Sequence, residues 1–496
     1  MLQEVDANPS VTDVVRFGTD GWRGRIAREF TFDNVARVAE ATARFLLSEE
    51  RKELAIYTDW RAEYRSPANG VVLGYDTRFL SFEFAMHFAR VMTDCGIPVE
   101  MSDAALPTPA LSYAVVDRRA VAGIMFTASH NPPTDNGIKY KAEYGGSATA
   151  EVTSGVEARL PARARTPTAA AASVARIDFR TPFLDRVRTF IDCDRLRAAP
   201  VFVVVDSMYG SARGYVAELL AENGVSYVQI RGTRDVLFGG KKPEPLEENL
   251  VPLRAVIASR AKKHPRMVGV VTDGDGDRVS GMDERGGFID AHRTFALILR
   301  YLLEVRGWRG AVVKSFNLTD MATAICREYD LPMIEVPIGF KHAVEHILKS
   351  NVLVAAEESG SIAIQGHIPE RDGVLNSMLL AELAASCKGT LSEEIDRLSS
   401  DLGPHVYHRK DITVPGRLEV VARLMADPPD RFGGRPVKAV ETMDGLKLRF
   451  SKGWLLFRAS GTEPILRLYC EMPAERDVWA VLDEAEKLAR GDLTLW

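Results

Sequence analysis

The stretch Val268-Gly269-Val270-Val271-Thr272-Asp273-Gly274-Asp275-Gly276-Asp277-Arg278 joins a short apolar run directly to three alternating carboxylates. An uninterrupted valine-rich run of this length is typical of a strand buried in a parallel sheet. Two other segments repeat the plan: Ala122–Phe126 leads into Thr127-Ala128-Ser129-His130-Asn131-Pro132, and Val352–Ala356 leads into Glu357-Glu358-Ser359-Gly360-Ser361. Because ligands bind beyond the carboxyl ends of such strands, these three loops are the candidate sites.

Each of the three segments also begins with an apolar strand and continues with further strands and helical patterns. The first strands are Val71–Asp76, Val201–Val205 and Ala311–Val313, and later strands are expected at Val225–Ile230 and Met333–Val336. Apolar strands that alternate with helices predict sheets covered on both faces. The sequence therefore predicts three related α/β domains with mainly parallel mixed sheets.

The chain after residue 403 has a different pattern. Short strands are expected at Lys447–Phe450, Trp454–Arg458 and Ile465–Tyr469, and a terminal helix near Glu475–Ala489. This pattern predicts a smaller C-terminal α+β domain. The four predicted domains span residues 1–178, 179–291, 292–403 and 404–496.

Composition argues against several classes of function. The chain has 496 residues, with 63 Lys and Arg against 68 Asp and Glu, and its net charge of −5 gives no support for nucleic-acid binding. The five cysteines form no Cys-x-x-Cys pair, so neither zinc nor redox chemistry is indicated. With no secretory signal pattern, and no apolar run near the roughly 18 residues of a membrane span, we expect a cytoplasmic protein without a membrane partner. The sequence leaves the oligomeric state open.

The carboxylates Asp273, Asp275 and Asp277 point to a cation. Three carboxylates at alternate positions repel one another unless a metal ion or cationic side chains neutralise them, and oxygen ligands suit Mg²⁺, Ca²⁺ or Mn²⁺. An EF-hand is excluded, because Arg278 stands where that loop needs glycine and a strand precedes it. The alternative is an acidic surface turn.

Three further groups of side chains suit phosphate and sugar chemistry. Ser129 stands beside His130, a base that could activate its hydroxyl, with Lys139 ten residues further on. Arg458-Ala459-Ser460-Gly461-Thr462-Glu463-Pro464, with Arg467 nearby, offers the donors that a phosphate dianion needs. Glu357 and Ser359 can bind vicinal sugar hydroxyls. Taken singly, each group is also compatible with an ordinary polar turn.

Together these strings are similar to those of the α-D-phosphohexomutase superfamily, of the phosphoglucomutase and phosphomannomutase type. The resemblance rests on Phe17-Gly18-Thr19-Asp20-Gly21-Trp22-Arg23-Gly24, Thr127–Pro132 with Asn136–Lys139, Asp273–Arg278, Glu357–Gly360 and Arg458–Pro464, in that order. It implies four domains around one cleft and a dependence on Mg²⁺. It also implies that a phosphoryl group moves between C1 and C6 of a hexose phosphate through a hexose 1,6-bisphosphate.

The resemblance implies a role for each matching residue. Ser129 is expected to be the phosphoserine and to complete the Mg²⁺ shell through its phosphate, while Lys139, His130 and Arg23 supply positive charge or move protons. The expected Mg²⁺ ligands are Asp273, Asp275 and Asp277. The expected substrate-binding residues are Arg278, Glu357, Ser359, Arg458, Ser460, Gly461, Thr462 and Arg467.

One position departs from the family pattern. Many relatives of the phosphomannomutase type have histidine after the Glu-x-Ser-Gly string, where this chain has Ser361. The candidates for proton transfer are therefore Lys139 first, His130 second and His367 third. The string 366–373, which contains His367, resembles that of phosphoglucomutase-like members and favours glucose phosphates, with mannose phosphates second.

The same motifs are compatible with other functions. Within the superfamily, the chain could be a phosphoglucosamine or phosphopentose mutase. Outside mutase chemistry, it could be a metal-dependent phosphatase or a non-catalytic protein that binds sugar phosphates. A non-catalytic protein would be expected to lose Ser129 or an aspartate ligand, and this chain keeps them all.

Overall fold

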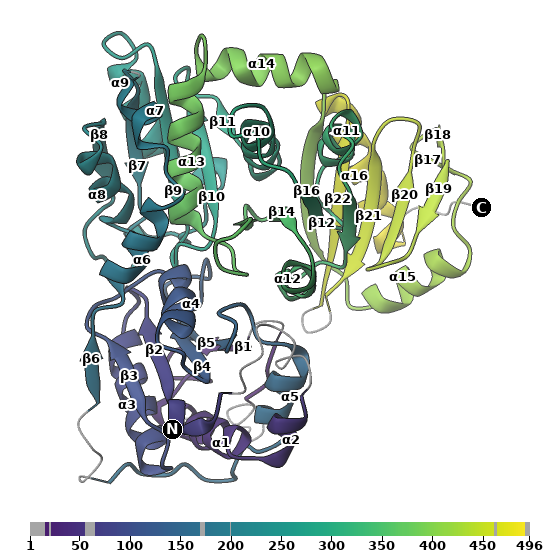
Figure 1. Cartoon of the computed structure of the whole chain (residues 1–496). Coiled ribbons are helices and arrows are strands. Elements are labelled where there is room, and N and C mark those ends of the chain that lie inside the picture. The colour runs from purple at the N-terminus through teal and green to yellow at the C-terminus, as the bar shows by residue number, and fades with distance from the viewer. Residues whose placement is uncertain are drawn as a thin grey trace, which may run out of the picture.

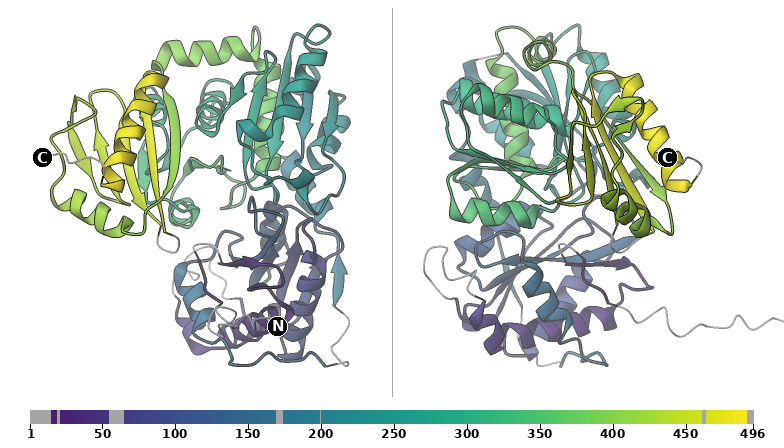
Figure 2. Two further views of the ribbon diagram at one scale, coloured as in Figure 1. Left: turned by 180° about the vertical axis from the view of Figure 1, so that it is seen from behind. Right: turned by 90° about the vertical axis from the view of Figure 1, so that its right-hand side faces the viewer.

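The computed structural model describes residues 15–18, 21–54, 65–168, 174–198, 200–460 and 464–491. The predicted fold class is confirmed: three α/β domains with mainly parallel sheets are followed by a smaller domain with an antiparallel sheet. In Figure 1 the first domain lies below, the second and third lie above it, and the fourth lies at the right beside the third. Figure 2 shows the same arrangement from behind and from the side.

The first domain has a six-stranded sheet in the order β1-β5-β4-β2-β3-β6. Strand β2 pairs in parallel with β3 and β4, whereas β5 runs antiparallel to β4 and β1. The strands are β1 Gly21–Arg25, β2 Val71–Tyr75, β3 Val99–Ser102, β4 Ala122–Phe126, β5 Asp135–Ala142 and β6 Ala175–Ile177. The helices are α1 Phe32–Leu46, α2 Glu49–Glu53, α3 Ser81–Asp94, α4 Thr108–Asp117 and α5 Ala150–Glu157.

The second domain has a five-stranded sheet in the order β11-β10-β9-β7-β8. Every residue of β7 and β9 is buried, as their apolar, valine-rich sequences predict. The strands are β7 Phe202–Asp206, β8 Ser226–Ile230, β9 Met267–Thr272, β10 Val279–Asp283 and β11 Phe288–Ile289. The helices are α6 Arg180–Arg188, α7 Cys193–Ala198, α8 Tyr215–Glu222 and α9 Val251–Arg260.

The third domain has a four-stranded sheet in the order β13-β12-β14-β15. The strands are β12 Ala311–Ser315, β13 Met333–Val336, β14 Val352–Ala356 and β15 Ile362–Ile364. The helices are α10 Ala291–Glu304, α11 Met321–Glu328, α12 Phe340–Lys349, α13 Gly373–Ser386 and α14 Leu391–Leu402. Helix α13 packs against β9 and β10 of the second domain, so it joins the two domains (Figure 1).

Each candidate loop has the same place in its sheet. It connects a strand with parallel pairing to an antiparallel neighbour, from β4 to β5, from β9 to β10 and from β14 to β15. All three loops therefore follow the carboxyl ends of buried strands, where ligand sites are expected.

The fourth domain has an antiparallel sheet in the order β16-β22-β21-β20-β19 and a separate hairpin of β17 and β18. The strands are β16 Val406–Thr413, β17 Arg431–Phe432, β18 Arg435–Pro436, β19 Ala439–Glu441, β20 Leu446–Arg449, β21 Trp454–Ala459 and β22 Ile465–Met472. The helices are α15 Arg417–Ala426 and α16 Glu475–Arg490. Among the described helices of the whole chain, none is both long and apolar enough to cross a lipid bilayer.

The first three domains share a hydrophobic core, whereas the fourth domain has its own. One buried cluster runs through the first three domains and includes Val72, Val203 and Val312. The fourth domain has a separate core, with Leu448 and Leu468 among its members. Its contact with the third domain contains a smaller apolar cluster built around Trp454 and Phe316.

Lys447 is buried at the contact between the third and fourth domains. Its ammonium donates to the carbonyl of Phe316 at 2.6 Å and lies 4.6 Å from the ring centres of both Phe316 and Trp454. Glu335 lies 3.4 Å from Lys447 and 2.9 Å from Lys314, which is also fully buried. Burial, together with the charge of Lys314, lowers the pKa of Lys447 to about 8.

This shifted pKa predicts a pH-dependent stability. An unfolded lysine titrates near pH 10.4, so below pH 8 both states hold the proton and the folded state carries the full cost of burying it. As the pH rises from 8 towards 10.4, the folded state loses its proton first and that cost disappears. Relative to Lys447→Met, the wild type should gain roughly 3 kcal/mol of unfolding free energy over this range, measured by urea denaturation.

Lys438→Met is the matched control, because it removes an exposed lysine from the same domain. The stability difference between this control and the wild type should stay constant over the same range. A constant difference for Lys447→Met as well would show that the buried ammonium carries no such cost.

Candidate active site

A cleft of about 770 Å³ is lined by residues from all four domains. Ser129 and Lys139 come from the first domain, Arg278 from the second, Glu357 from the third and Arg467 from the fourth. Arginine and lysine side chains outnumber carboxylates in the lining. Such a surface attracts anionic ligands.

Ser129 lies in the loop after β4 and is buried. Its φ of 53° is in the left-handed region, which costs a non-glycine residue about 1–2 kcal/mol. The N–H of Ser129 donates to Thr127 Oγ1 at 2.8 Å, and its hydroxyl donates to Asp273 Oδ2 at 3.0 Å. The strained loop therefore directs the serine hydroxyl at the loop of the second domain, and strain of this kind is typical of functional sites.

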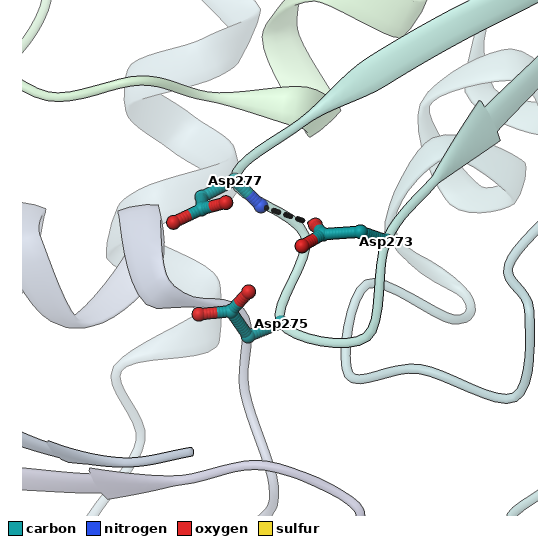
Figure 3. A group of neighbouring side chains, drawn as sticks. All are labelled: Asp273, Asp275 and Asp277. Atoms are coloured by element: carbon teal, nitrogen blue, oxygen red, sulfur yellow. Dashed lines mark hydrogen bonds between the residues drawn. The ribbon is translucent and has the colours of Figure 1, made fainter. Parts of the chain in front are cut away.

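Asp273, Asp275 and Asp277 converge in the loop between β9 and β10 (Figure 3). All three are buried, and one carboxylate oxygen from each lies within 4.8 Å of the others. The N–H of Asp277 donates to Asp273 Oδ1 at 3.0 Å, drawn as a dashed line in Figure 3. The structure thus brings together the three aspartates that the sequence singled out.

Backbone donors from three domains hold this aspartate loop, residues 273–278. The N–H of Thr108 donates to the carbonyl of Asp275 at 2.8 Å, and that of Ser211 donates to the carbonyl of Gly274 at 3.0 Å. The N–H of Gly373, at the start of α13, donates to the carbonyl of Gly276 at 3.0 Å. The loop conformation therefore depends on the packing of the first three domains.

Cationic side chains neutralise part of the aspartate charge. Lys139 Nζ donates to Asp275 Oδ2 at 2.7 Å and to Asp277 Oδ2 at 2.8 Å, and Arg371 Nε donates to Asp277 Oδ2 at 2.9 Å. Burial alone would lower the pKa of Lys139, but the two carboxylates outweigh it and raise the pKa above its usual value. Burial opposes ionisation of Asp277, yet Arg371 and Lys139 hold its pKa well below the usual range. Burial and the two neighbouring carboxylates raise the pKa of Asp273 well above its usual range.

The same loop fits a divalent cation. Asp275 Oδ1 and Asp277 Oδ1 are buried and have no hydrogen-bond partner among the described residues. Buried carboxylate oxygens without donors are costly unless a cation pairs with them. A set of ligands made only of carboxylate oxygens suits Mg²⁺, and Ser129 Oγ lies next to the set.

His130 and Arg278 both lie beside the carboxylate of Glu244 in the cleft. His130 Nδ1 lies 3.4 Å from Ser129 Oγ and its Nε2 lies 3.8 Å from Glu244 Oε1, while Arg278 Nη1 donates to the same carboxylate oxygen at 3.5 Å. Burial, with the charges of Arg278 and Arg23, lowers the pKa of His130 well below its usual value. The lowered pKa favours the neutral imidazole, whose Nδ1 lies beside the Ser129 hydroxyl.

Arg23 is placed by strand β1, which pairs with β5 so that Arg23 lies opposite Gly137. It lines the cleft, and its Nη1 donates to Asn131 Oδ1 at 3.2 Å. The strand therefore brings Arg23 to the loop that carries Ser129. The neighbouring Thr19 and Asp20 of the same string lie outside the described residues.

His367, the third candidate for proton transfer, is not among the residues that line the cleft. Its Nε2 lies 2.8 Å from Asp372 Oδ2, and its ring packs beside those of Phe183 and Phe190. Asp372 also accepts the N–H groups that begin α13. The histidine therefore supports the start of a helix, a role that its polar sequence context did not indicate.

Glu357 and Ser359 both line the cleft, as expected for residues that contact a ligand. Glu357 Oε1 accepts the N–H of Gly339 at 2.8 Å. Ser359 Oγ lies 2.9 Å from Ser361 Oγ, so the residue that replaces the common histidine is a hydrogen-bond partner of Ser359. The neighbouring Glu358 accepts from Tyr407 of the fourth domain at 2.9 Å and so connects the two domains.

The fourth domain adds two arginines to the cleft, Arg467 from β22 and Arg409 from β16. Asp411 lies between them, with Oδ1 at 3.0 Å from Arg409 Nε and Oδ2 at 3.8 Å from Arg467 Nε. Arg409 Nη1 also donates to Glu358 Oε1 at 3.3 Å. Two guanidinium groups held in this way can bind a phosphate dianion.

The structure describes only some of the remaining residues of the predicted phosphate loop, 458–464. Arg458 Nε donates to Asp444 Oδ1 at 3.0 Å. Ser460 is buried, and its N–H donates to the carbonyl of Ile465 at 2.8 Å. Gly461 and Thr462 lie outside the described residues, so their expected contacts stay predictions.

Several residues of the cleft were not predicted from the sequence: Glu244, Glu358, Arg371 and Arg409. Arg371 lies in the 366–373 string, and its position between two acidic residues is a sequence signal for a buried ion pair. Arg409 and Glu244 stand in stretches without a motif, and only the fold brings them to the cleft.

Comparison with protein families gives matches along almost the whole chain. The model described as phosphoglucomutase/phosphomannomutase, alpha/beta/alpha domain I, matches residues 14–166, and those for domains II and III match residues 181–286 and 290–401. The model for the C-terminal domain of the same family matches residues 413–488.

Individual relatives are similar over nearly their full length. A phosphoglucomutase/phosphomannomutase of Thermococcus kodakarensis is 28% identical over 477 residues, which is 95% of this chain and 98% of the relative. A protein of Methanothermobacter thermautotrophicus, named as a probable phosphoglucosamine mutase, is 29% identical. The match covers 92% of this chain and 94% of the relative's chain.

Solved structures agree with these matches. The crystal structure of a Thermus thermophilus protein, provisionally named phosphomannomutase, is 33% identical, with a TM-score of 0.83 over 97% of this chain and 100% of that one. An Aspergillus fumigatus N-acetylphosphoglucosamine mutase in complex with GlcNAc-6P and magnesium shares the fold, with 14% identity and a TM-score of 0.53 over 97% of this chain and 96% of that one.

Proposed function

The chain belongs to the phosphoglucomutase/phosphomannomutase family of α-D-phosphohexomutases, and from that premise we propose that it interconverts hexose 1-phosphates and hexose 6-phosphates through a phosphoryl group carried on Ser129. The observation that carries the proposal is the contact between Ser129 Oγ and Asp273 Oδ2 at 3.0 Å. It places a hydroxyl group beside a buried aspartate loop that suits a divalent cation, at the wall of a cationic cleft.

The proposed reaction has two phosphoryl transfers. In the first, the free hydroxyl of the hexose phosphate attacks the phosphorus on Ser129; the P–Oγ bond breaks, and the hydroxyl proton passes to Ser129 Oγ. The product is a hexose 1,6-bisphosphate, which turns in the cleft. In the second, Ser129 Oγ attacks the other phosphorus; the sugar C–O–P linkage breaks at phosphorus, and the departing sugar oxygen takes up the proton.

The neighbours of Ser129 suit different tasks in these transfers. His130 Nδ1 faces Ser129 Oγ at 3.4 Å, so we assign proton transfer to it. The N–H groups of Lys139 are directed at two carboxylates, so we assign charge neutralisation to that residue. Arg23 and Arg278 add positive charge along the cleft, which stabilises the oxygens of a transferring phosphoryl group.

We assign Mg²⁺ binding to Asp273, Asp275 and Asp277, with the phosphate of Ser129 as a further ligand. When bound, Mg²⁺ neutralises negative charge that develops on the phosphoryl oxygens. The buried Asp275 Oδ1 and Asp277 Oδ1, which lack donors among the described residues, support this assignment.

We assign the sugar hydroxyls to Glu357 and Ser359, which line the same cleft as Ser129. The phosphate that does not react is assigned to the fourth domain, to Arg467 and Arg409 in the cleft. Arg458, Ser460, Gly461 and Thr462 complete this proposed phosphate site. Fixing that phosphate far from Ser129 allows either end of the sugar to face the serine in turn.

We propose glucose phosphates as the preferred substrates, with mannose phosphates second, on the resemblance of the 366–373 string. Relatives named phosphoglucosamine mutase make glucosamine phosphates the main alternative. The carboxylates of Glu244 and Glu357 in the cleft could each pair with the ammonium group of that sugar.

The test is a panel of 1-phosphates of glucose, mannose, glucosamine and ribose, with Mg²⁺ and a trace of the matching bisphosphate. We expect kcat/KM for glucose 1-phosphate to exceed that for each of the others by about tenfold or more, the range that a few sugar contacts can supply. Isomer formation and free phosphate are both measured. A preference for glucosamine 1-phosphate would replace the sugar assignment, and phosphate release without isomer would identify a phosphatase.

A further inference from the structure

We propose that Arg78 is the positioning residue of the phosphoryl-carrying loop, and that it sets the direction of the Ser129 hydroxyl without touching the substrate. The inference rests on the proposed function, because it concerns how Ser129 is presented for transfer. Arg78 follows β2, in a segment that the sequence did not single out, and its side chain is fully buried.

Arg78 donates to four backbone carbonyls of the serine loop. Its Nη2 donates to the carbonyls of Ser129 at 2.6 Å and Asn131 at 2.7 Å. Its Nη1 donates to the carbonyls of Pro132 at 2.7 Å and Asp135 at 3.1 Å. One guanidinium group therefore fixes the loop from the serine to the first residue of β5.

The guanidinium is itself held by a carboxylate and an aromatic ring. Its Nε lies 3.1 Å from Asp76 Oδ2, and the other oxygen of Asp76 accepts from Ser81 Oγ at 2.7 Å and from the N–H of Arg78 at 2.9 Å. The ring of Phe238, from the second domain, lies 5.0 Å from the guanidinium carbon. Arg78 is therefore a rigid part of the scaffold, and the loop conforms to it.

The Ser129 carbonyl connects this scaffold to the direction of the hydroxyl. A Cβ atom built on Gly274 of the aspartate loop would lie 2.5 Å from the Ser129 carbonyl oxygen, so that oxygen is confined between Gly274 and Arg78. Arg78 and Gly274 therefore hold the peptide group that follows Ser129, and from this loop, with φ at 53°, Ser129 Oγ donates to Asp273. Loss of Arg78 would free the loop to relax to an unstrained backbone.

Only arginine supplies this set of contacts. A guanidinium has five N–H donors in a planar fork, four of which point to carbonyls here, whereas a lysine ammonium has three donors on a flexible chain. Arg78→Lys keeps the charge and most of the volume but cannot reach all four carbonyls. The variant therefore separates positioning from charge.

The experiment measures steady-state kinetics and the transfer of a phosphoryl group from glucose 1,6-bisphosphate to Ser129, by intact mass and peptide mapping. For Arg78→Lys we expect kcat and the rate of Ser129 phosphorylation to fall about 100-fold, the usual effect of misplacing a reacting group by about 1 Å. KM should stay within about threefold of the wild type, because the sugar and phosphate contacts come from other domains.

Arg65→Lys is the matched control. Arg65 Nη1 also donates to backbone carbonyls in the first domain, those of Val115, Ala120 and Glu143 at 2.7–3.0 Å. Arg65 contacts none of the loop residues that Arg78 binds, so its substitution should lower the melting temperature but leave kcat near the wild-type value. An equal loss of kcat in both variants, or no loss in folded Arg78→Lys, overturns the inference.

Two further outcomes have definite meanings. If the wild type takes up no phosphoryl group on Ser129 from glucose 1,6-bisphosphate, the proposed function fails, whatever the Arg78 variants show. If Arg78→Lys does not give folded protein by circular dichroism, Asp76→Asn decides instead: it weakens the anchor of the guanidinium and should lower kcat about tenfold at unchanged KM. An unchanged kcat in folded Asp76→Asn would overturn the inference.

Discussion

Ser129→Ala is expected to lower kcat by about 10⁴-fold or more, the loss seen when the group that forms a covalent intermediate is removed. The serine oxygen is the proposed carrier of the phosphoryl group, and alanine offers no atom to replace it. The side chain is buried and small, so the substitution should leave the fold intact. The assay is isomer formation with glucose 1-phosphate and a trace of glucose 1,6-bisphosphate.

Binding should survive this substitution. The residues assigned to the sugar and the distant phosphate lie in the third and fourth domains, so calorimetry with glucose 6-phosphate should give a dissociation constant within a few-fold of the wild type. Ser112→Ala is the matched control: it removes a buried hydroxyl of the same domain that has no hydrogen-bond partner among the described residues. Turnover of Ser129→Ala within tenfold of this control would contradict the serine assignment.

Asp275→Asn is expected to lower turnover by about 10²–10⁴-fold and to raise the Mg²⁺ concentration needed for half-maximal rate. Mg²⁺ at a phosphoryl transfer site contributes several kcal/mol of charge stabilisation, and each 1.4 kcal/mol corresponds to a factor of ten. The asparagine amide lacks the negative charge that attracts Mg²⁺. It also lacks the charge that pairs with Lys139, whose Nζ lies 2.7 Å from Asp275 Oδ2. The measurement is a Mg²⁺ titration of kcat/KM after the protein has been treated with a chelator.

Asp194→Asn provides the comparison for this prediction. Asp194 belongs to the same domain, and its side chain is fully exposed, so the titration of this variant should superimpose on that of the wild type. If the Asp275→Asn titration also superimposed on the wild type, the metal assignment for this residue would be wrong.

The central strands and the aspartate loop were accessible from sequence because their signals are local. β4, β13 and β14 have the expected bounds, and β9 extends the apolar run Val268–Val271 by one residue at each end. A run of buried valines and an alternation of carboxylates can each be recognised within a dozen residues. The loops that follow these strands could be located for the same reason.

The contacts of β5 could not be predicted in this way. Its alternation of Lys139 and Lys141 with apolar residues suggests lysines in solvent, yet both ammonium groups are buried. Lys139 pairs with Asp275 and Asp277 of the second domain, and Lys141 pairs with Glu370 of the third. The hydropathy pattern shows that a side chain is charged, but it does not show the distant partner that makes its burial favourable. For the same reason the position of Arg409 in the cleft could not be predicted from the sequence.

The backbone donors of the aspartate loop have a consequence for biosynthesis. Residues 273–278 are translated long after Thr108 and Ser211 but about a hundred residues before Gly373, whose N–H binds Gly276. Domains generally fold in order as the chain leaves the ribosome. The nascent chain therefore lacks one hydrogen bond to its aspartate loop until α13 emerges, so the loop cannot reach its complete geometry before most of the third domain has been translated.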